Sequence, residues 1–313
     1  MSRLGIKLTL LVILACSPFF FVGGPGYHST RSFQAVWDLG HIVIFTLITL
    51  VIVTYQSRSE SIFGGRLFWI KIFLLVLLLG LGVELCQTAV NGRGSDVADL
   101  LRNQLGCMFG YYFYSFKNKP ISRLWDNTRH IVAACCFCFA IFPLFIALGD
   151  EVLAYYQFPV LSNFESVWEK RRWVDQRQLS IDHDIKTNGD HSLRIRLSTA
   201  TYSGASLFHF PNKWIGYQWI YFSVFNPNSG MLTLHVRIHD EEHKFHNNEF
   251  LDRYYHTFQL NPGWNKLRIS LEDVENAPKS RKMNMDAIEQ VGFFVMNLPR
   301  PQSIYLDNLY LAK

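Results

Sequence analysis

The chain has 313 residues, of which 49% are hydrophobic and 18% are charged, and its formal net charge at pH 7 is +5. Long apolar runs end near residue 149, whereas apolar and polar residues alternate after it. This composition excludes an ordinary soluble single-domain protein, and the scattered basic residues exclude a nucleic-acid-binding stripe. We therefore predict a multi-domain chain with an all-α transmembrane helix bundle in residues 1–150 and an all-β domain in residues 151–313.

Five apolar segments predict membrane-spanning helices, because each approaches the roughly 20 residues that cross a bilayer core. They cover about residues 4–22, 39–55, 67–87, 97–116 and 129–148. The first segment also fits a signal peptide, and residues 13–16 resemble a lipoprotein cleavage box, but the apolar segments that follow favour an uncleaved span. The fourth segment begins with polar residues, so its first two turns must lie at the interface or inside the bundle.

The distribution of basic residues predicts the orientation of the bundle. With a cytoplasmic N-terminus, the outer loops contain only Arg31 and Arg93, and the inner segments contain Arg3, Lys7, Arg58, Arg66, Lys117, Lys119, Arg123 and Arg129. Under the positive-inside rule, five spans export the chain after Asp150. We therefore expect a multi-pass protein in a lipid bilayer with its C-terminal domain outside.

A group of polar residues interrupts the apolar segments near the predicted outer surface. Its members are Asp38, His41, Glu84, Gln87, Arg93, Asp96, Asp99 and Asn103. Helical spacing lets three helix ends direct these groups into one pocket. In a purely structural alternative, Asp96 and Asp99 serve the start of a helix, and Gly106 and Gly110 permit close helix packing. Capping does not account for the whole group, so we predict a functional pocket.

The order and spacing of these residues resemble the VanZ-like family over about residues 1–150. The pattern reads Asp38-x-x-His41, Glu84-x-x-Gln87, then Arg93 with Asp96 or Asp99, Asn103, Gly106 and Gly110. Leu39 and Gly40 replace the basic residue often found after the first aspartate, so no lysine-dependent role is implied there. The resemblance implies a protein of the bacterial inner membrane and, for some members, resistance to glycopeptide antibiotics of the teicoplanin type. It implies no defined biochemical activity.

The second half of the chain alternates apolar and polar residues in short segments. Residues 191–197, 219–225, 232–238 and 267–271 predict strands, with turns at 226–230 and 261–263. Such spacing predicts an all-β sandwich. Residues 189–313 resemble the galactose-binding-like jelly rolls of carbohydrate-binding modules, on residues 189–195, 221–227, 237–240, 253, 262–265 and 304–311.

This second resemblance implies that the exported, periplasmic or extracellular domain binds a glycan. Sugars stack on aromatic faces and bond to polar side chains, which makes candidates of Tyr202, Trp214, Tyr217, His239, Arg253, Tyr254 and Tyr255. Trp219, Tyr221 and Trp264 are expected to fill the sandwich core instead. Asp307 is a candidate for a structural calcium site, and no other metal or cofactor is predicted. All six cysteines lie in apolar runs, which argues against a disulfide framework.

Three functions stay open at this point. The first is a non-enzymatic VanZ-like envelope protein whose outer domain engages a glycan or glycoconjugate. The second is a membrane enzyme acting on a lipid-linked glycan or phosphate through His41, Glu84, Arg93 and Asp99, and the third is a lipid or glycolipid transporter. No nucleophile with its base, metal triad or phosphate loop is recognisable, and no internal repeat suggests a transporter. The sequence therefore favours the binding protein.

Overall fold

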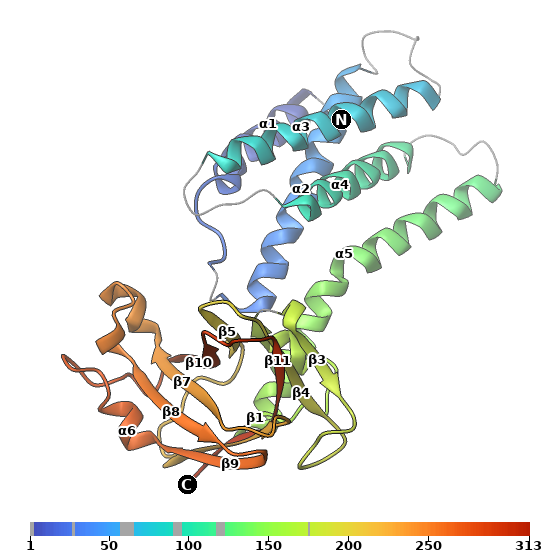
Figure 1. Ribbon diagram of the computed structural model, residues 1–313. Helices are drawn as coiled ribbons and strands as arrows, with labels where there is room; N and C mark the ends of the chain where they lie inside the picture. The colour runs from blue at the N-terminus through green and yellow to red at the C-terminus, as the bar shows by residue number, and fades with distance from the viewer. Residues whose placement is uncertain (1–2, 27–28, 57–65, 90–95, 117–122, 175) are drawn as a thin grey trace. The chain divides into compact units, whose positions relative to one another are not determined.

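The computed structural model describes the chain except for residues 1–2, 27–28, 57–65, 90–95, 117–122 and 175. It divides into two compact units, a helical unit, Met1–Ala147, and a β unit, Leu148–Lys313 (Figure 1). A helical region followed by a β-sandwich is the architecture that the sequence predicts.

The helical unit contains the elements whose apolar runs predicted membrane spans. They are α1 (Arg3–Cys16), η1 (Ser17–Phe20), α2 (Arg31–Gln56), α3 (Arg66–Thr88), α4 (Val97–Phe116) and most of α5 (Arg123–Gln157). Among the described residues, four helical segments are long and apolar enough to cross a membrane: Arg3–Phe20, Arg31–Gln56, Leu67–Thr88 and Asn127–Gln157. The polar first turns of α4 lower its hydropathy, so the count of five spans stays a prediction.

Two glycines of α4 allow it to pack closely against α2. A Cβ atom on Gly106 would lie 2.6 Å from the carbonyl oxygen of Ile42, and one on Gly110 would lie 2.6 Å from Cβ of Thr49. The Thr46 hydroxyl donates to the carbonyl groups of Ile42 at 2.7 Å and of Gly106 at 3.1 Å. The small residues thus bring the backbones of the two helices within hydrogen-bonding reach of a side chain.

The β unit is a sandwich of two antiparallel sheets. Its strands are β1 (Val160–Ser162), β2 (Trp173–Val174), β3 (Leu179–Asp182), β4 (Ser192–Leu197), β5 (Tyr202–Leu207), β6 (Trp219–Asn226), β7 (Leu232–Asp240), β8 (Tyr254–Leu260), β9 (Gly263–Ser270), β10 (Ile288–Met296) and β11 (Gln302–Ala312). One sheet has the order β3-β4-β11-β6-β9, with β1 also paired to β11, and the other has the order β2-β5-β10-β7-β8. A short helix, α6 (Leu271–Glu275), follows β9.

Strand β6 illustrates how the alternation of side chains builds the core between the sheets. Its inward-facing residues are buried, and they are Ile220, Phe222 and Val224. Trp219 and Tyr221 alternate with these residues and are only partly buried on the outer face. Trp264 of β9 lies opposite Phe225 of β6 and shares that outer face. The expectation that these three aromatic residues fill the core is therefore wrong, because both faces of β6 are apolar.

Helix α5 continues past its predicted end near residue 148, and its last turns belong to the β unit. There Glu169 is completely buried and accepts the backbone N–H groups of Asn163 at 2.9 Å and Phe164 at 2.8 Å. Gln157, the last residue of α5, approaches the same carboxylate at 3.4 Å. This buried carboxylate therefore organises the turn that follows β1.

Candidate functional site

In the helical unit, the polar residues gather around Arg102 of α4. The Arg102 guanidinium lies 2.7 Å from the Asp38 carboxylate of α2 and 3.6 Å from that of Asp96, and it also bonds to Asp99. Nε2 of His41 lies 3.5 Å from the other oxygen of Asp99. One guanidinium thus pairs with three carboxylates, which come from α2, from α4 and from the residue directly before α4. Polar groups in apolar segments are retained when they are paired in this way.

The inner end of this cluster is tightly enclosed. His41, Asn103 and Gln87 are each at most 4% exposed. Nδ1 of His41 lies 3.2 Å from Oδ1 of Asn103, and the Gln87 amide donates to the carbonyl group of Phe20 at 2.8 Å. The ring of Phe20 packs edge-on against His41, with 4.8 Å between centroids. His41 also borders an apolar groove of about 440 Å³ between η1 and α2.

Glu84 at the end of α3 contacts the start of the next helix. Its Oε2 accepts the backbone N–H of Asp96 at 2.8 Å, while its buried Oε1 has no hydrogen-bond partner among the described residues. Nδ2 of Asn103 is unsatisfied in the same way. Arg93, the remaining predicted member of the pocket, lies outside the described residues.

A second collection of polar and aromatic residues lies on the outer face of the five-stranded sheet. Strand register aligns these residues in two rows across β5, β10, β7 and β8. The first row consists of Gly204, Phe294, His235 and Thr257, and the second of Ser206, Gly292, Arg237 and Tyr255. The opposite faces of these strands form the core, so both rows face away from it.

A groove of about 370 Å³ follows these rows. Its lining includes Tyr202, Gly204, Ser206, Arg237, Arg253 and Phe294. Glycine is required at its floor, because a Cβ atom on Gly204 would lie 2.0 Å from the carbonyl oxygen of Phe293. A Cβ atom on Gly292 would lie 2.9 Å from Nε of Arg237, so that arginine lies directly over the glycine. The two glycines therefore permit close packing at the base of the groove.

Aromatic rings form one wall of the groove. Tyr202 is 64% exposed, and its ring lies 6.0 Å from that of Phe294. His235 stacks on Phe294 at 5.3 Å and on Tyr255 at 5.7 Å. The Tyr255 hydroxyl and Nδ1 of His235 are hydrogen-bonded at 2.5 Å, and burial lowers the pKa of that histidine. These contacts hold the rings in place beside an open surface.

Two arginines supply the polar groups of the groove. The Arg237 guanidinium lies 6.0 Å from the ring centroid of Phe294. The Arg253 guanidinium lies 5.0 Å from that of Phe250, a ring that is 53% exposed. Stacking on a ring orients the planar N–H donors of a guanidinium.

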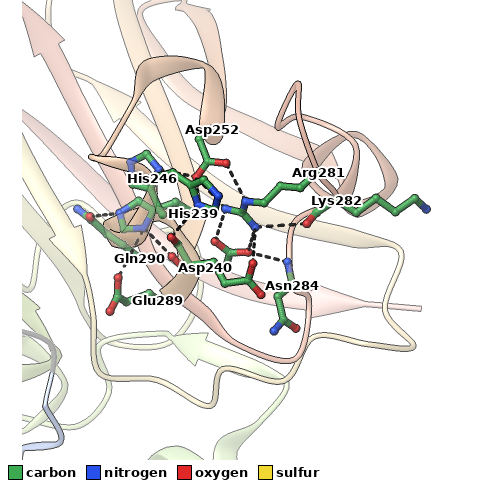
Figure 2. Close-up of polar contacts among 11 residues, drawn as sticks. His239, Asp240, His246, Asp252, Arg281, Lys282, Asn284, Glu289 and Gln290 are labelled. Carbon is green, nitrogen blue, oxygen red and sulfur yellow. Dashed lines mark hydrogen bonds and ion pairs between the residues drawn. The ribbon is translucent and has the colours of Figure 1, made fainter.

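Beyond the end of β7, Arg281 clamps two buried carboxylates (Figure 2). It donates to Asp252 at 2.7 and 2.8 Å and to Asp240 at 2.5 and 2.7 Å. The backbone N–H of Asn284 also donates to Asp240, at 2.6 Å. Burial alone would raise the pKa of both carboxyl groups, but the hydrogen bonds and charge of Arg281 lower it below the usual value.

His239 lies beside this clamp and is 6% exposed (Figure 2). Its Nε2 lies 2.5 Å from Oε1 of Gln290, and its Nδ1 lies 3.7 Å from Glu289. Burial lowers the pKa of His239 to about 4, so the ring is neutral at pH 7. Lys244 approaches Glu289 at 3.8 Å. Within the part of the chain that the structure describes, no group of three or more His, Cys, Asp or Glu residues is arranged to hold a metal ion.

A comparison with protein families bears on the helical part of the chain, which contains the cluster around Arg102. Residues 8–118 match the VanZ/LLP1 family. The match covers the paired cluster around Arg102 and the glycine contacts between α2 and α4, as the sequence pattern predicts. None of the curated proteins compared with the chain matches it. We refer to these residues as the VanZ/LLP1-like region.

Solved structures similar to this chain match its β unit rather than the VanZ/LLP1-like region. A family 11 carbohydrate-binding module from Clostridium thermocellum, in complex with a β-1,3-1,4-mixed-linked tetrasaccharide, is 14% identical, with a TM-score of 0.35, over 49% of this chain and 94% of the module. An exo-β-agarase is 13% identical, with a TM-score of 0.38, over 49% of this chain and 24% of the agarase. These likenesses concern the β-sandwich fold alone.

The structure separates the ligand-binding candidates of the β unit. Tyr202 and Arg253 line the groove and Tyr255 flanks it, while His239 is buried beside the Arg281 clamp. The others lie in the core or against it, and they are Trp214, Tyr217 and Tyr254. A ligand role for each candidate stays a prediction. Sequence reasoning missed Arg237, His235 and Phe294 as groove residues, although polar residues at every second position of β7 were a usable signal.

Asp307 of β11 is completely buried. Its Oδ2 accepts the backbone N–H groups of Thr187 at 2.8 Å and Asn188 at 3.1 Å. Burial raises the pKa of this carboxyl group despite these bonds. Its Oδ1 has no hydrogen-bond partner among the described residues. The calcium site suggested for Asp307 stays a prediction.

Proposed function

We propose that the protein is a membrane-anchored glycan-binding protein of the bacterial cell envelope. The apolar helices hold the VanZ/LLP1-like region in the cytoplasmic membrane, and the β unit engages a glycan or glycoconjugate on the outer side. The observation that carries the proposal is the groove on the five-stranded sheet, where an exposed tyrosine ring lies beside arginine side chains.

The size and chemistry of the groove suit a short saccharide. Its volume of about 370 Å³ falls within the range of about 300 to 1,000 Å³ that is typical of small-molecule sites. A pyranose presents C–H groups on its faces and hydroxyl groups at its rim. The ring of Tyr202 offers a face to the former, while Arg237 and Arg253 offer donors to the latter.

The distribution of basic residues supports the outward placement of the β unit. With the N-terminus inside, the predicted inner segments carry most of the lysines and arginines of the first half, and the chain after residue 150 is exported. If the glycan is a lipid-linked precursor of the cell wall, the protein would act where glycopeptide antibiotics act. Resistance to such antibiotics is therefore part of the proposal.

The test is a glycan array probed with the full-length protein in nanodiscs of zwitterionic lipid. We expect a defined group of glycans to bind, and Tyr202→Ala to weaken their binding about tenfold or more, as loss of a stacking ring does at binding hot spots. Trp219→Ala, on the outer face of the opposite sheet, is the matched control and should leave binding unchanged. Equal binding by Tyr202→Ala and the parent protein would place the site elsewhere.

Catalysis or transport in the VanZ/LLP1-like region is a second candidate, favoured by one observation. Oxygen Oε1 of Glu84 is buried without a partner among the described residues, as an acid awaiting a substrate would be. The pairing of Arg102 with its three carboxylates supports a structural role for the cluster instead. Glu84→Gln at normal membrane level discriminates between them, because loss of the cellular function would favour chemistry or transport.

A further inference from the structure

Arg253 carries a positive charge that nothing in the described structure offsets. Its Nε atom is buried without a hydrogen-bond partner, and no carboxylate forms an ion pair with it among the described residues. Its guanidinium lies 5.0 Å from the ring centroid of Phe250. Tyr202 and Tyr255, the residues whose electrostatic interactions bear on it, carry phenol groups rather than carboxylates.

The carboxylate next to Arg253 in the chain already has a cationic partner. Both oxygens of Asp252, the residue immediately before Arg253, bond to Arg281. Arg281 also holds Asp240, as Figure 2 shows, and Lys244 approaches Glu289. The Arg281 clamp therefore engages the carboxylate that precedes Arg253 in the chain. Burying an unpaired cation costs free energy, and a bound anion would recover part of it.

The sheet places a second positive charge near the first. Arg237 of β7 is the register partner of Tyr255, and Arg253 lies two residues before that tyrosine along the chain. Arg253 directly precedes β8 with an extended backbone, and both arginines line the same groove. The aromatic rings of the groove can stack on neutral and on acidic sugars equally well. The two arginines, in contrast, favour a sugar that carries negative charge.

We infer that the groove selects an acidic glycan, whose carboxylate or sulfate group binds the Arg253 guanidinium. The inference rests on the proposed glycan-binding function and adds the chemical class of the ligand to it. A guanidinium presents a planar fork of N–H donors, which matches the paired oxygens of a carboxylate or a sulfate. Arg237 would bind the same group or the acid of the next sugar.

The experiment compares saccharides that differ only in charge. Full-length protein in nanodiscs of zwitterionic lipid is titrated with oligogalacturonate and its fully methyl-esterified form, and with a sulfated galactan and its desulfated form. We expect the acidic member of at least one pair to bind about tenfold or more tightly than its neutral partner. The affinity should fall as salt rises from about 50 to 500 mM, because screening weakens an ion pair. The two pairs distinguish carboxylate from sulfate recognition.

Matched variants assign that preference to Arg253. Arg253→Gln should lower the affinity for the acidic member about tenfold and that for the neutral member much less, which shrinks the acidic-to-neutral ratio, while Arg253→Lys should lose less. Arg268→Gln is the control, because Arg268 lies on the opposite sheet and also stacks on a ring, 4.4 Å from that of Trp219. Intrinsic fluorescence during urea unfolding checks that each variant folds. The comparison of acidic with neutral saccharides and the salt titration are both made on the parent protein, so they do not depend on the folding of any variant.

The outcomes separate this inference from the function on which it rests. Equal or tighter binding of the neutral members, or an unchanged affinity in folded Arg253→Gln, overturns acid selection and leaves glycan binding intact. Binding of no glycan, in these pairs or on the array, overturns both proposals. Acid preference that survives Arg253→Gln but disappears in Arg268→Gln would move the site to the other sheet and overturn the assignment.

Discussion

Arg172 and Asp150 form an ion pair in which neither side chain is exposed to solvent. Nη2 of Arg172 lies 3.0 Å from the carboxylate, and Nε lies 3.1 Å from each of its oxygens. The guanidinium also donates to the carbonyl group of Leu161 at 3.3 Å and to Gln157 at 3.2 Å. Because Asp150 belongs to α5 and Leu161 to β1, one buried side chain ties the last turns of the helix to the sandwich.

Breaking this pair should strongly destabilise the β unit. Arg172→Met leaves the Asp150 carboxylate buried without its partner, and such a change costs about 3 to 5 kcal/mol. Urea unfolding followed by tryptophan fluorescence measures the loss. Lys282→Gln is the control, because its pair with Glu275 lies at 3.0 Å but is 70% and 38% exposed, and exposed pairs contribute about 0 to 1 kcal/mol. Similar losses in both variants would contradict the prediction.

The Arg281 clamp should make the stability of the β unit fall at acid pH. The pKa of Asp240 and of Asp252 is lowered from the usual 3.8. Below that value the unfolded chain takes up protons that the folded carboxylates refuse. The stabilising contribution is therefore complete above about pH 4 and is lost as the pH falls through the folded pKa. Urea unfolding between about pH 2 and 6 follows this loss.

Removing the clamp should reverse the sign of that dependence. In Arg281→Gln both carboxylates stay buried without a guanidinium, so burial raises their pKa above that of the unfolded chain. Protonation then favours the folded state, and the stability of the variant should rise as the pH falls from about 7 to 4. A parallel pH profile in variant and parent would show that Arg281 does not control these acids.

His239 should add a second acid-sensitive component at higher pH. Its pKa is lowered from 6.5 to about 4 by burial. As the pH falls from 6.5 towards 4, only the unfolded chain binds the proton, which removes about 3 kcal/mol at about 1.4 kcal/mol per unit. Below about pH 4 this contribution is constant. His239→Gln should flatten the stability profile in this window, and an unchanged slope would refute the assignment.

The strand pattern of the β unit could be predicted from sequence, but the faces of its strands could not. Alternation located β4, β6 and β7, because period-two patterns report a strand directly. In β6 both sets of alternating residues are apolar, so the pattern does not say which set is buried. Trp219 and Tyr221 were consequently expected in the core, although the structure places them outside. Which set of β6 residues is buried depends on how strands far apart in the sequence pair and pack.

The same limit applies to the two candidate sites. The polar cluster of the VanZ/LLP1-like region was recognisable, since charged residues within apolar segments stand out in one dimension. The groove depends on register, which brings Arg237, Gly292 and Tyr255 into one row although they come from three strands. The buried partnership of Asp150 with Arg172 gave no signal either, because each residue alone reads as an ordinary polar position near a domain boundary.

The contact between α2 and α4 should depend on the absence of a side chain at Gly106. A Cβ atom there would lie 2.6 Å from the carbonyl oxygen of Ile42 and 2.8 Å from Cβ of Phe45, so Gly106→Ala must push the helices apart. Overpacking of this kind costs about 1 to 3 kcal/mol. We expect a lower unfolding temperature of the full-length protein in detergent, measured by size-exclusion after heating.

Gly82→Ala in α3 is the matched control, because no packing neighbour among the described residues lies within 4 Å of the Cβ atom that it adds. Alanine favours a helix over glycine by about 1 kcal/mol, so this variant should be as stable as the parent protein or more stable. The two substitutions have the same intrinsic helix preference, and the difference between them therefore isolates the packing of α4 on α2. If Gly106→Ala were as stable as Gly82→Ala, the two helices would not be held together at the spacing described.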